Sequence, residues 1–596
     1  MRRLPILLVV VACHGGVPAA SAPAVDARGI ALRTQTADQQ VGHALSRLTF
    51  GARPGDVETV RAMGVDRWIE QQLHPERIDD SRADAWVNQF EATTSTAAEL
   101  ETRYQNPGTL ANLLGRRSAG GLTREDSAQV REARQHLRRI GEEVQLSHVG
   151  RALQSERQLQ EVLTDFWLNH FTVFSGKGVR EQYYLAEYEN RVIRPRALGR
   201  FRDLLGAVAK SPAMLFYLDN WESAADSGRP RLVAATQRRR PAGRNPQSPG
   251  VQQLQRRARA GLNENYGREL LELHTLGVDG GYSQQDVIAA ARALTGWTIA
   301  GPQQGGGFAF VASMHDAGAK TVLGRTLRAG RGIEDGEELL DLVARHPSTA
   351  RFIAFKLARR LVSDTPSATL VARATATFTR TDGDIREVVR TIVTSPEFFS
   401  AEAYRAKVKT PFEVVLSALR SVGATPDLTP RTAQLIAGLG QPLFGHQTPN
   451  GWPETADGWL GTGAILNRIN FGLLLASGRV PGANPIAFPG LEAIRTAPRE
   501  RQVDAVVSAF LGGDVSSVTR SVLLTGKNPL LEQQGALESA PPPPDPLMAS
   551  DIPRDPPSVR QAQRPAPART AGQLPPLTGL PQLIGLALGS PEFQRR

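Results

Sequence analysis

Hydrophobic residues recur at intervals of three and four along most of the chain. In the first such stretch, residues 38–75, Val41, Leu45 and Leu48 fall on one face of a helix. A turn containing Gly and Pro divides this stretch into two helices, and Asp56 is placed to cap the second. The pattern predicts a mainly α protein with a multi-helix body, because the same periodicity returns in later segments: 122–220, 263–297, 334–420 and 481–531.

The sharpest single prediction is a helix over 263–277. Asn263 is a favourable N-cap, and Gly277 occupies the position just after the last turn, where helices commonly end. His274 shares a face with the apolar residues and is expected to point inward. A second helix, predicted over 286–297, should pack against the first.

Between residues 302 and 324 the pattern changes from helical spacing to short runs of strand-forming residues. A Gly-rich stretch is followed by apolar runs at 308–311 and 321–323. We therefore expect a small β-hairpin insertion at 302–324, with one hairpin or two, inside the helical body.

Two segments lack hydrophobic periodicity. Residues 224–262 are rich in Arg, Pro, Gln and Gly, which predicts a basic mobile loop. Residues 532–580 are Pro-rich, which predicts an extended linker near the C-terminus. Ser-Pro pairs that begin at Ser211, Ser395 and Ser590 close three helical patterns. We interpret these patterns as a weak internal repeat whose third copy docks back after the linker.

The predicted organisation runs from an export signal to a C-terminal helix. Its parts are a signal at 1–24, an N-terminal helical part at 38–223, the basic loop at 224–262, a central helical part at 263–480 that contains the β insertion, a helical continuation at 481–531, the linker at 532–580 and a helix at 581–596.

The N-terminus has the composition of an export signal. Arg2 and Arg3 precede the short apolar run 4–12, and small residues follow. This run is too short to cross a bilayer, because a spanning helix needs about 20 residues.

Cys13, the only cysteine of the chain, ends the apolar run. The sequence Val-Val-Ala-Cys resembles the lipobox of bacterial lipoproteins, and this resemblance implies lipidation of Cys13 and cleavage before it. Two acyl chains would anchor the protein to a membrane stably. We expect an outer-membrane or periplasmic lipoprotein; by resemblance to lipoprotein sorting, His14 rather than Asp after the cysteine favours the outer membrane. The alternative is cleavage further on, which would give a secreted protein without Cys13.

The composition of the chain argues against several classes of function. The formal net charge is +11, yet only seven of the 70 basic residues are Lys, and the Arg residues are scattered. Their densest cluster, at 238–259, contains no aromatic residue, and no nucleic-acid-binding motif occurs, so we expect no nucleic-acid partner. A single cysteine excludes an internal disulfide and a Cys-based zinc site.

Several motifs together point to one family. They are His43-Ala-Leu-Ser-Arg-Leu-Thr-Phe-Gly, Phe166-Trp-Leu-Asn-His-Phe, the long stretch 263–282, Leu294-Thr-Gly-Trp, His315-Asp-Ala-Gly-Ala-Lys, and Gly440-Gln-Pro-Leu-Phe with Asn450-Gly-Trp. From about residue 38 to about 480 the chain resembles the bacterial family called domain of unknown function 1800. The resemblance implies an exported protein with a helical body, and an exported sulfatase-like or phosphatase-like protein as a partner. It implies no activity, because that family is uncharacterised.

The candidate site centres on two histidines. His170 and His274 lie on aromatic or apolar helix faces, where a hydrogen-bonded core histidine is commoner than a functional one. In the functional interpretation they face Asn263 and Glu264 and could meet in space to bind a metal. However, neither His-Glu-x-x-His nor the Glu-x-x-His of di-iron bundles occurs, so no metal is predicted and the cofactor stays unknown.

His315 and Asp316 form a second candidate, since a histidine beside a carboxylate in a loop can act as a base or a ligand. Three Gly-Trp pairs form a third. They place Trp297, Trp452 and Trp459 after tight turns, where indoles serve either as stacking platforms for sugars and cations or as plugs of the core.

Two classes of function follow. The first is a non-catalytic, exported cell-envelope protein that binds or assists an exported partner or an extracellular polymer. The second is a metal-assisted or acid–base hydrolytic enzyme that uses the His, Glu and Asn cluster. The first is favoured, because the chain has no Gly-x-Ser-x-Gly elbow, P-loop or dinucleotide fingerprint.

Overall fold

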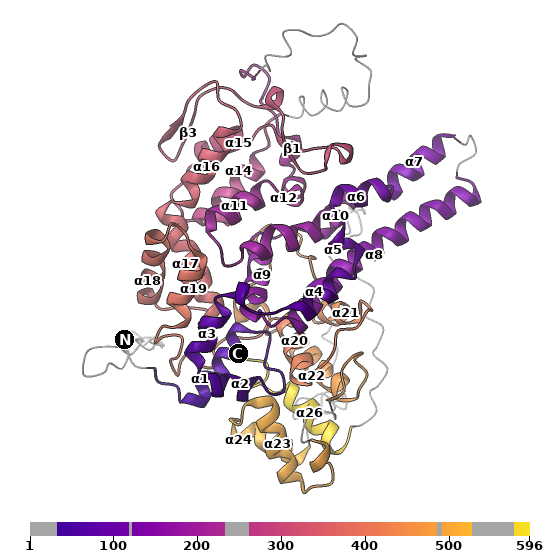
Figure 1. Ribbon diagram of the computed structural model, residues 1–596, viewed down its shortest axis with the longest axis vertical. Helices are drawn as coiled ribbons and strands as arrows, with labels where there is room; N and C mark the ends of the chain where they lie inside the picture. The colour runs from indigo at the N-terminus through magenta and orange to yellow at the C-terminus, as the bar shows by residue number, and fades with distance from the viewer. Residues whose placement is uncertain (1–32, 118–121, 233–260, 486–490, 527–576) are drawn as a thin grey trace, which may run out of the picture.

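The computed structural model describes residues 33–117, 122–232, 261–485, 491–526 and 577–596 (Figure 1). In these residues the fold is mainly α with a small amount of β structure, as the hydrophobic pattern predicts. The signal at 1–24, Cys13 and most of the predicted loop and linker lie outside the described residues.

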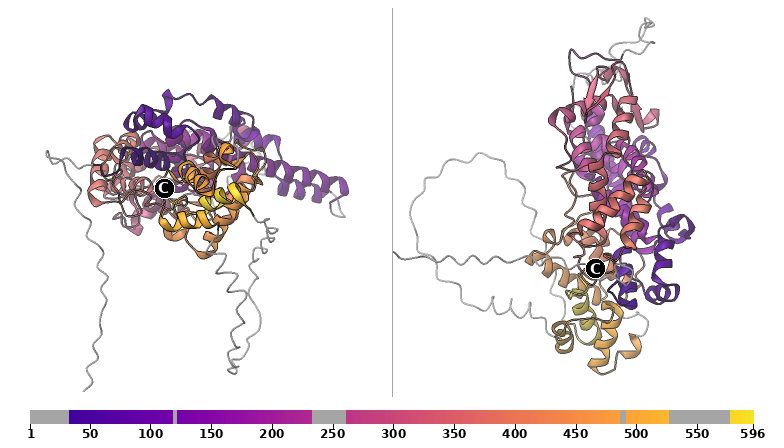
Figure 2. Two further views of the ribbon diagram at one scale, coloured as in Figure 1. Left: turned by 90° about the horizontal axis from the view of Figure 1, so that it is seen from below. Right: turned by 90° about the vertical axis from the view of Figure 1, so that its left-hand side faces the viewer.

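The N-terminal half is a series of helices, from which one pair projects as an arm. Figure 2 shows this pair, α7 and the long helix α8, extending away from the rest of the molecule. The helices of this half are α1 (Ala37–Leu48), α2 (Asp56–Met63), α3 (Val65–Gln72), α4 (Ser81–Asn88), α5 (Glu91–Thr94), α6 (Ala97–Arg103), α7 (Pro107–Arg117), α8 (Arg124–Gln154), α9 (Gln158–His170), α10 (Val179–Glu187), α11 (Phe201–Ala209) and α12 (Pro212–Tyr217).

The remaining helices lie at both ends of the elongated body, with α14–α16 near the top and α23 and α24 at the bottom, and α17–α19 along one side (Figure 1). They are α14 (Glu264–Leu271), α15 (Gln284–Ala293), α16 (Glu334–Ala344), α17 (Pro347–Leu361), α18 (Ala368–Arg380), α19 (Ile385–Val393), α20 (Pro411–Ser421), α21 (Arg431–Gly438), α22 (Thr462–Ala476), α23 (Arg499–Leu511), α24 (Ser517–Thr525) and α26 (Gly579–Gly589). None of the helices in the described part of the chain has the length and apolar character needed to cross a membrane.

The predicted helix over 263–277 is confirmed. The Asn263 side chain accepts a hydrogen bond from the backbone N–H of Asn265, so it caps α14 as expected. The helix then widens into a π-helical turn, Glu272–Leu276, and ends at Gly277, whose φ is 84°. His274 lies in this π-helical turn and is buried.

The β insertion contains two antiparallel hairpins. β1 (Trp297–Ile299) pairs with β2 (Phe308–Phe310), and β3 (Lys320–Val322) pairs with β4 (Arg325–Leu327). The prediction that a helix continues to residue 297 is wrong. α15 ends at Ala293, Gly296 takes a positive φ of 79°, and Trp297 then enters the β1 ladder opposite Phe310.

The predicted cap at Asp56 is also wrong in detail. The N-cap of α2 is Gly55, and Asp56 is the first helical residue. Its carboxylate turns back and accepts the backbone N–H of Arg53 at 2.8 Å, because the tight turn that contains Gly55 brings that donor close.

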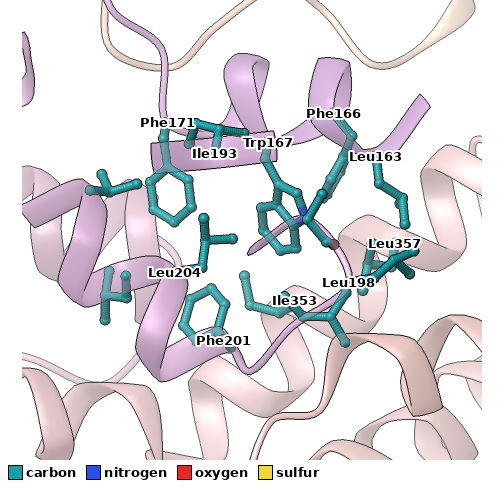
Figure 3. Packing of buried hydrophobic residues seen from close by; sticks show 14 of the residues in the cluster. Leu163, Phe166, Trp167, Phe171, Ile193, Leu198, Phe201, Leu204, Ile353 and Leu357 are labelled. Atoms are coloured by element: carbon teal, nitrogen blue, oxygen red, sulfur yellow. The ribbon is translucent and has the colours of Figure 1, made fainter. Parts of the chain in front are cut away.

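Two hydrophobic cores hold these helices together. The first is built mainly from α1 to α19, and its centre is packed around Trp167, Phe171 and Phe201 (Figure 3). The second is built from α20 to α26 with the C-terminal end of α8. The last helix, α26, packs against α22 and α23, so the C-terminal segment docks on the body as predicted. The domain boundaries and the internal repeat stay predictions.

Candidate functional site

The two candidate histidines lie next to each other in the first core. Their ring centroids are 6.4 Å apart, and the Nε2–H of His170 donates to the backbone oxygen of His274 at 3.1 Å. Phe171 packs edge-on against both rings. His170 Nδ1 and His274 Nε2 have no hydrogen-bond partner among the described residues.

Burial keeps both imidazoles neutral. Loss of hydration, together with the charge of Lys356, lowers the pKa of His274 to about 3. The same causes, with an added contribution from His274, lower the pKa of His170 well below its ordinary value. Neutral imidazoles can ligate a metal, but no group of three or more His, Cys, Asp or Glu side chains within the described ranges is arranged to hold one.

His315 and Asp316 belong to a separate, buried network in the β insertion. His315 Nδ1 donates to the backbone oxygen of Thr295 at 2.8 Å, and its Nε2 faces Asp335 at 3.4 Å. Asp335 also accepts a hydrogen bond from Lys320 at 2.6 Å. Asp316 points elsewhere and pairs with Arg292 at 2.7 Å. These contacts give each side chain a partner inside the protein and tie the hairpins to α15 and α16.

The other predicted site residues also have local partners. The Asn263 side chain caps helix α14 and donates a hydrogen bond to the backbone oxygen of Leu218. Glu264 accepts a hydrogen bond from Gln284 at 2.7 Å. Trp297 is buried against Phe308. The structure therefore brings His170 and His274 together but does not gather His315, Asn263 and Glu264 into one site with them.

A different pocket collects three of the family motifs. It is lined by Phe166, Leu168 and Asn169 from the motif on α9, by the loop 441–446 and by the loop 452–459. Its cavity volume is about 80 Å³. We call it the motif pocket; its charged and ionisable lining residues are His148, Asp165, Arg360, Lys407, His446, Glu454 and Arg596.

Charged side chains form a connected network behind and along the wall of the motif pocket. Arg360 on α17 pairs with Asp165 at 3.0 Å and with Glu413 at 2.8 Å. Arg596 pairs with the same Glu413 at 2.9 Å. Burial alone would raise the pKa of Glu413, but the two guanidinium groups outweigh it and lower that pKa to about 2. Burial raises the pKa of Asp165 in spite of Arg360.

Cations outnumber carboxylates in this network. Lys407 donates to the backbone oxygen of Glu454 at 2.8 Å and pairs with Asp364. Lys409 donates to the Ser417 hydroxyl at 3.0 Å and lies over the Phe593 ring, 4.0 Å from its centroid. Burial, then the charge of Arg596, lowers the pKa of Lys407 to about 8, and burial lowers that of Lys409 to about 7. The cations are Arg47, Arg360, Lys407, Lys409 and Arg596, and the facing acids are Asp165, Asp364, Glu413 and Glu454.

Two indoles stand beside these charges. Trp452 and Trp459 line the pocket with ring centroids 6.0 Å apart, and the His446 ring lies 4.6 Å from Trp452. Trp452 is half-buried, whereas Trp459 is buried and donates its indole N–H to the Pro453 backbone oxygen at 3.0 Å.

Asn169 on α9 binds the loop 451–459, which we call the tryptophan loop. Its amide group donates to the backbone oxygen of Trp452 at 3.0 Å and accepts the Trp452 backbone N–H at 2.7 Å. Gly451 is required at this contact, since its φ is 72° and an added Cβ would lie 2.3 Å from the Asn169 backbone oxygen.

Fold and pocket together define a helical protein with a charged, indole-flanked pocket between two hydrophobic cores. The chain belongs to the family described as "Protein of unknown function (DUF1800)", whose model matches residues 43–595. The predicted family membership is thus confirmed over nearly the whole chain. No curated protein and no solved structure matches the chain.

Three of the family motifs in the sequence line the motif pocket, although the chemistry of their single residues does not indicate a site there. The motifs beginning at Phe166, Gly440 and Asn450 were each identifiable, but nothing in local periodicity shows that they meet. Arg360, Lys407 and Arg596 belong to none of the family motifs. They line the same pocket because segments far apart in the sequence meet after folding.

Proposed function

We propose that the protein is an exported cell-envelope binding protein whose motif pocket holds one acidic group of an extracellular polysaccharide. The observation that supports this most strongly is the excess of buried cations around the pocket. A bound anion would offset the mutual repulsion of Lys407 and Arg596. Hydrogen bonds between these cations and an anion would also be stronger than hydrogen bonds between neutral groups.

The size of the cavity favours a single acidic group over a whole sugar. A volume of about 80 Å³ is well below the roughly 300–1,000 Å³ of sites that enclose a whole small molecule. A carboxylate or sulfate group fits such a space. The sugar ring that carries it would stay outside, where the half-buried face of Trp452 offers a stacking surface.

Hydrolysis has weaker support. The raised pKa of Asp165 is a property of general acids, but its carboxylate is held by Arg360. His170 and His274 belong to the aromatic core and are absent from the lining of the motif pocket.

Export and anchoring form the second part of this proposal. The signal-like N-terminus and the lipobox-like sequence before Cys13 support an outer-membrane or periplasmic lipoprotein. Sulfatase-like and phosphatase-like enzymes act on acidic esters, so an exported partner of that kind would share an acidic substrate with this pocket.

Affinity electrophoresis with matched polymers tests the proposal. Polygalacturonate and dextran sulfate supply acidic groups, whereas methyl-esterified polygalacturonate and dextran are their neutral counterparts. We expect at least one acidic polymer to retard the protein and its neutral counterpart to fail. Lys407→Met and Trp452→Ala should abolish retardation, and the controls Lys177→Met and Trp221→Ala, which lie away from the pocket, should not. Equal retardation by acidic and neutral polymers, or none by either acid, would overturn the proposal.

A further inference from the structure

A second cavity, largely apolar, lies between α22, α24 and α26. Its volume is about 330 Å³, and aliphatic side chains form most of its wall: Ile465, Ile469, Val522, Leu523 and Leu586. Leu460 and Val518 also line it and are exposed to 43% and 69%. Large aliphatic side chains left in water beside an apolar cavity are typical of a binding site for an apolar ligand.

One buried cation lies in this apolar wall. Arg468 on α22 is only 2% exposed. Its Nη1 donates to the Gln594 side chain at 3.0 Å, but its Nε and Nη2 find no acceptor among the described residues. Leaving two guanidinium nitrogens without an acceptor in an apolar setting is costly, so an acceptor is expected from outside the described residues.

The identity of the two unpaired atoms specifies the shape of that acceptor. Nε and Nη2 lie on one edge of the planar guanidinium group, and this edge donates two parallel hydrogen bonds to the two oxygens of a carboxylate. We infer that this cavity binds a single-chain fatty acid, with its carboxylate on the Nε–Nη2 edge of Arg468 and its alkyl chain along the aliphatic wall.

Charge and volume both favour this ligand over other occupants. The cavity lies at the small end of the range for ligand sites, which suits one alkyl chain better than a two-chain lipid. The lining contains Arg468 and Arg595 but no Asp or Glu, so it complements a negative head group. The fatty-acid site shares only Val408 with the lining of the motif pocket, and it does not depend on the function proposed above.

Isothermal titration calorimetry of the full chain with decanoate and with 1-decanol tests this inference. Both ligands have the same alkyl chain, and only the first has a carboxylate. We expect one decanoate per chain, with an affinity at least about tenfold higher than that of decanol, as a charge-assisted pair of hydrogen bonds implies. Equal affinities of the two ligands would overturn the inference.

Variants separate the head-group contact from the apolar wall. Arg468→Met should reduce the affinity for decanoate to that for decanol, while Val522→Trp should fill the cavity and remove binding of both. Arg520→Met, which removes a surface arginine of α24 that pairs with Asp504, is the matched control and should bind as the parent does. Lys407→Met should also bind decanoate normally.

Two other occupants predict different results. If residues 527–576 of the same chain filled the cavity, the intact protein would bind neither ligand. If a second copy filled it, sedimentation would show a dimer that decanoate dissociates. Either result would overturn the assignment to a fatty acid.

Discussion

His274 is a buried histidine whose chemistry is set by its surroundings rather than by a ligand. Its ring packs edge-on against Phe171 with centroids 5.2 Å apart, and its Nε2 is unpaired among the described residues. An imidazole in this position resists protonation, because a charge there would lose its hydration and face Lys356.

This environment makes stability depend on pH. Unfolded histidine has a pKa of about 6.5, whereas His274 in the folded protein has a pKa of about 3. Between these values the unfolded chain binds the proton and the folded chain does not. The contribution of His274 to the free energy of unfolding is therefore complete above pH 6.5 and is lost as the pH falls towards 3.

His274→Gln should reduce that pH dependence. In urea unfolding, the parent should lose about 3 kcal/mol between pH 7 and pH 4 through this residue, and the variant should not. His170 stays in both proteins and contributes in the same direction. The control Asn265→Gln, on the exposed face of α14, changes no titratable group and should keep the pH dependence of the parent. If the free energy of unfolding of the variant depended on pH as the parent's does, His274 would titrate normally in the folded protein.

At the scale of elements, the contact between α9 and the tryptophan loop shapes the motif pocket. Two hydrogen bonds join Asn169 to the backbone of Trp452, across 283 positions of sequence. The loop has no regular secondary structure between Gly451 and Thr455, so this contact substitutes for a helix or a strand in fixing its path.

Asn169→Ala should therefore loosen the loop without disturbing α9. We expect a loss of about 1–3 kcal/mol in the free energy of unfolding, because two backbone groups of the half-buried Trp452 lose their partners. Hydrogen exchange of the peptide 446–459 should become faster, while exchange of α9 should not change. Asn265→Ala, on the exposed face of α14, is the matched control. Unchanged exchange in the loop would mean that other contacts hold it.

Hydrophobic periodicity predicted some helix boundaries and missed others. The cap at Asn263 and the stop at Gly277 are local, and both were predictable. The end of α15 was missed because Thr295 and Gly296 look compatible with a helix until Trp297 finds its strand partner Phe310. Strand pairing is a tertiary choice, and it outweighed helix spacing here.

Across the whole molecule, the motif pocket depends on segments that meet only after folding. Arg596 reaches the backbone oxygens of Arg47 and Arg360 and the carboxylate of Glu413, so α1, α17, α20 and the last residues converge at one point. No pattern along the chain indicates such a meeting. The family motifs could be found from the sequence, but the cations that give the pocket its charge could not.

The anchoring proposal also concerns the whole molecule. Cys13→Ser should move the protein from the membrane fraction to the soluble fraction of bacterial cells, because the acyl chains would have no thiol to attach to. Mass spectrometry of the mature N-terminus should show acyl groups on Cys13 in the parent. An unchanged membrane fraction, or a mature chain that begins after Cys13, would contradict lipidation.

Tryptophan fluorescence reports on whether one acidic group of a sugar occupies the motif pocket. Trp452 and Trp459 line that pocket, so a bound ligand must change their emission. Titration with hexagalacturonate should give a saturable change that its methyl ester does not give. The change should be absent in Lys407→Met and present in Lys177→Met. Emission that stays constant during the titration, or that responds equally to the neutral ester, would mean that the motif pocket does not bind an acidic group.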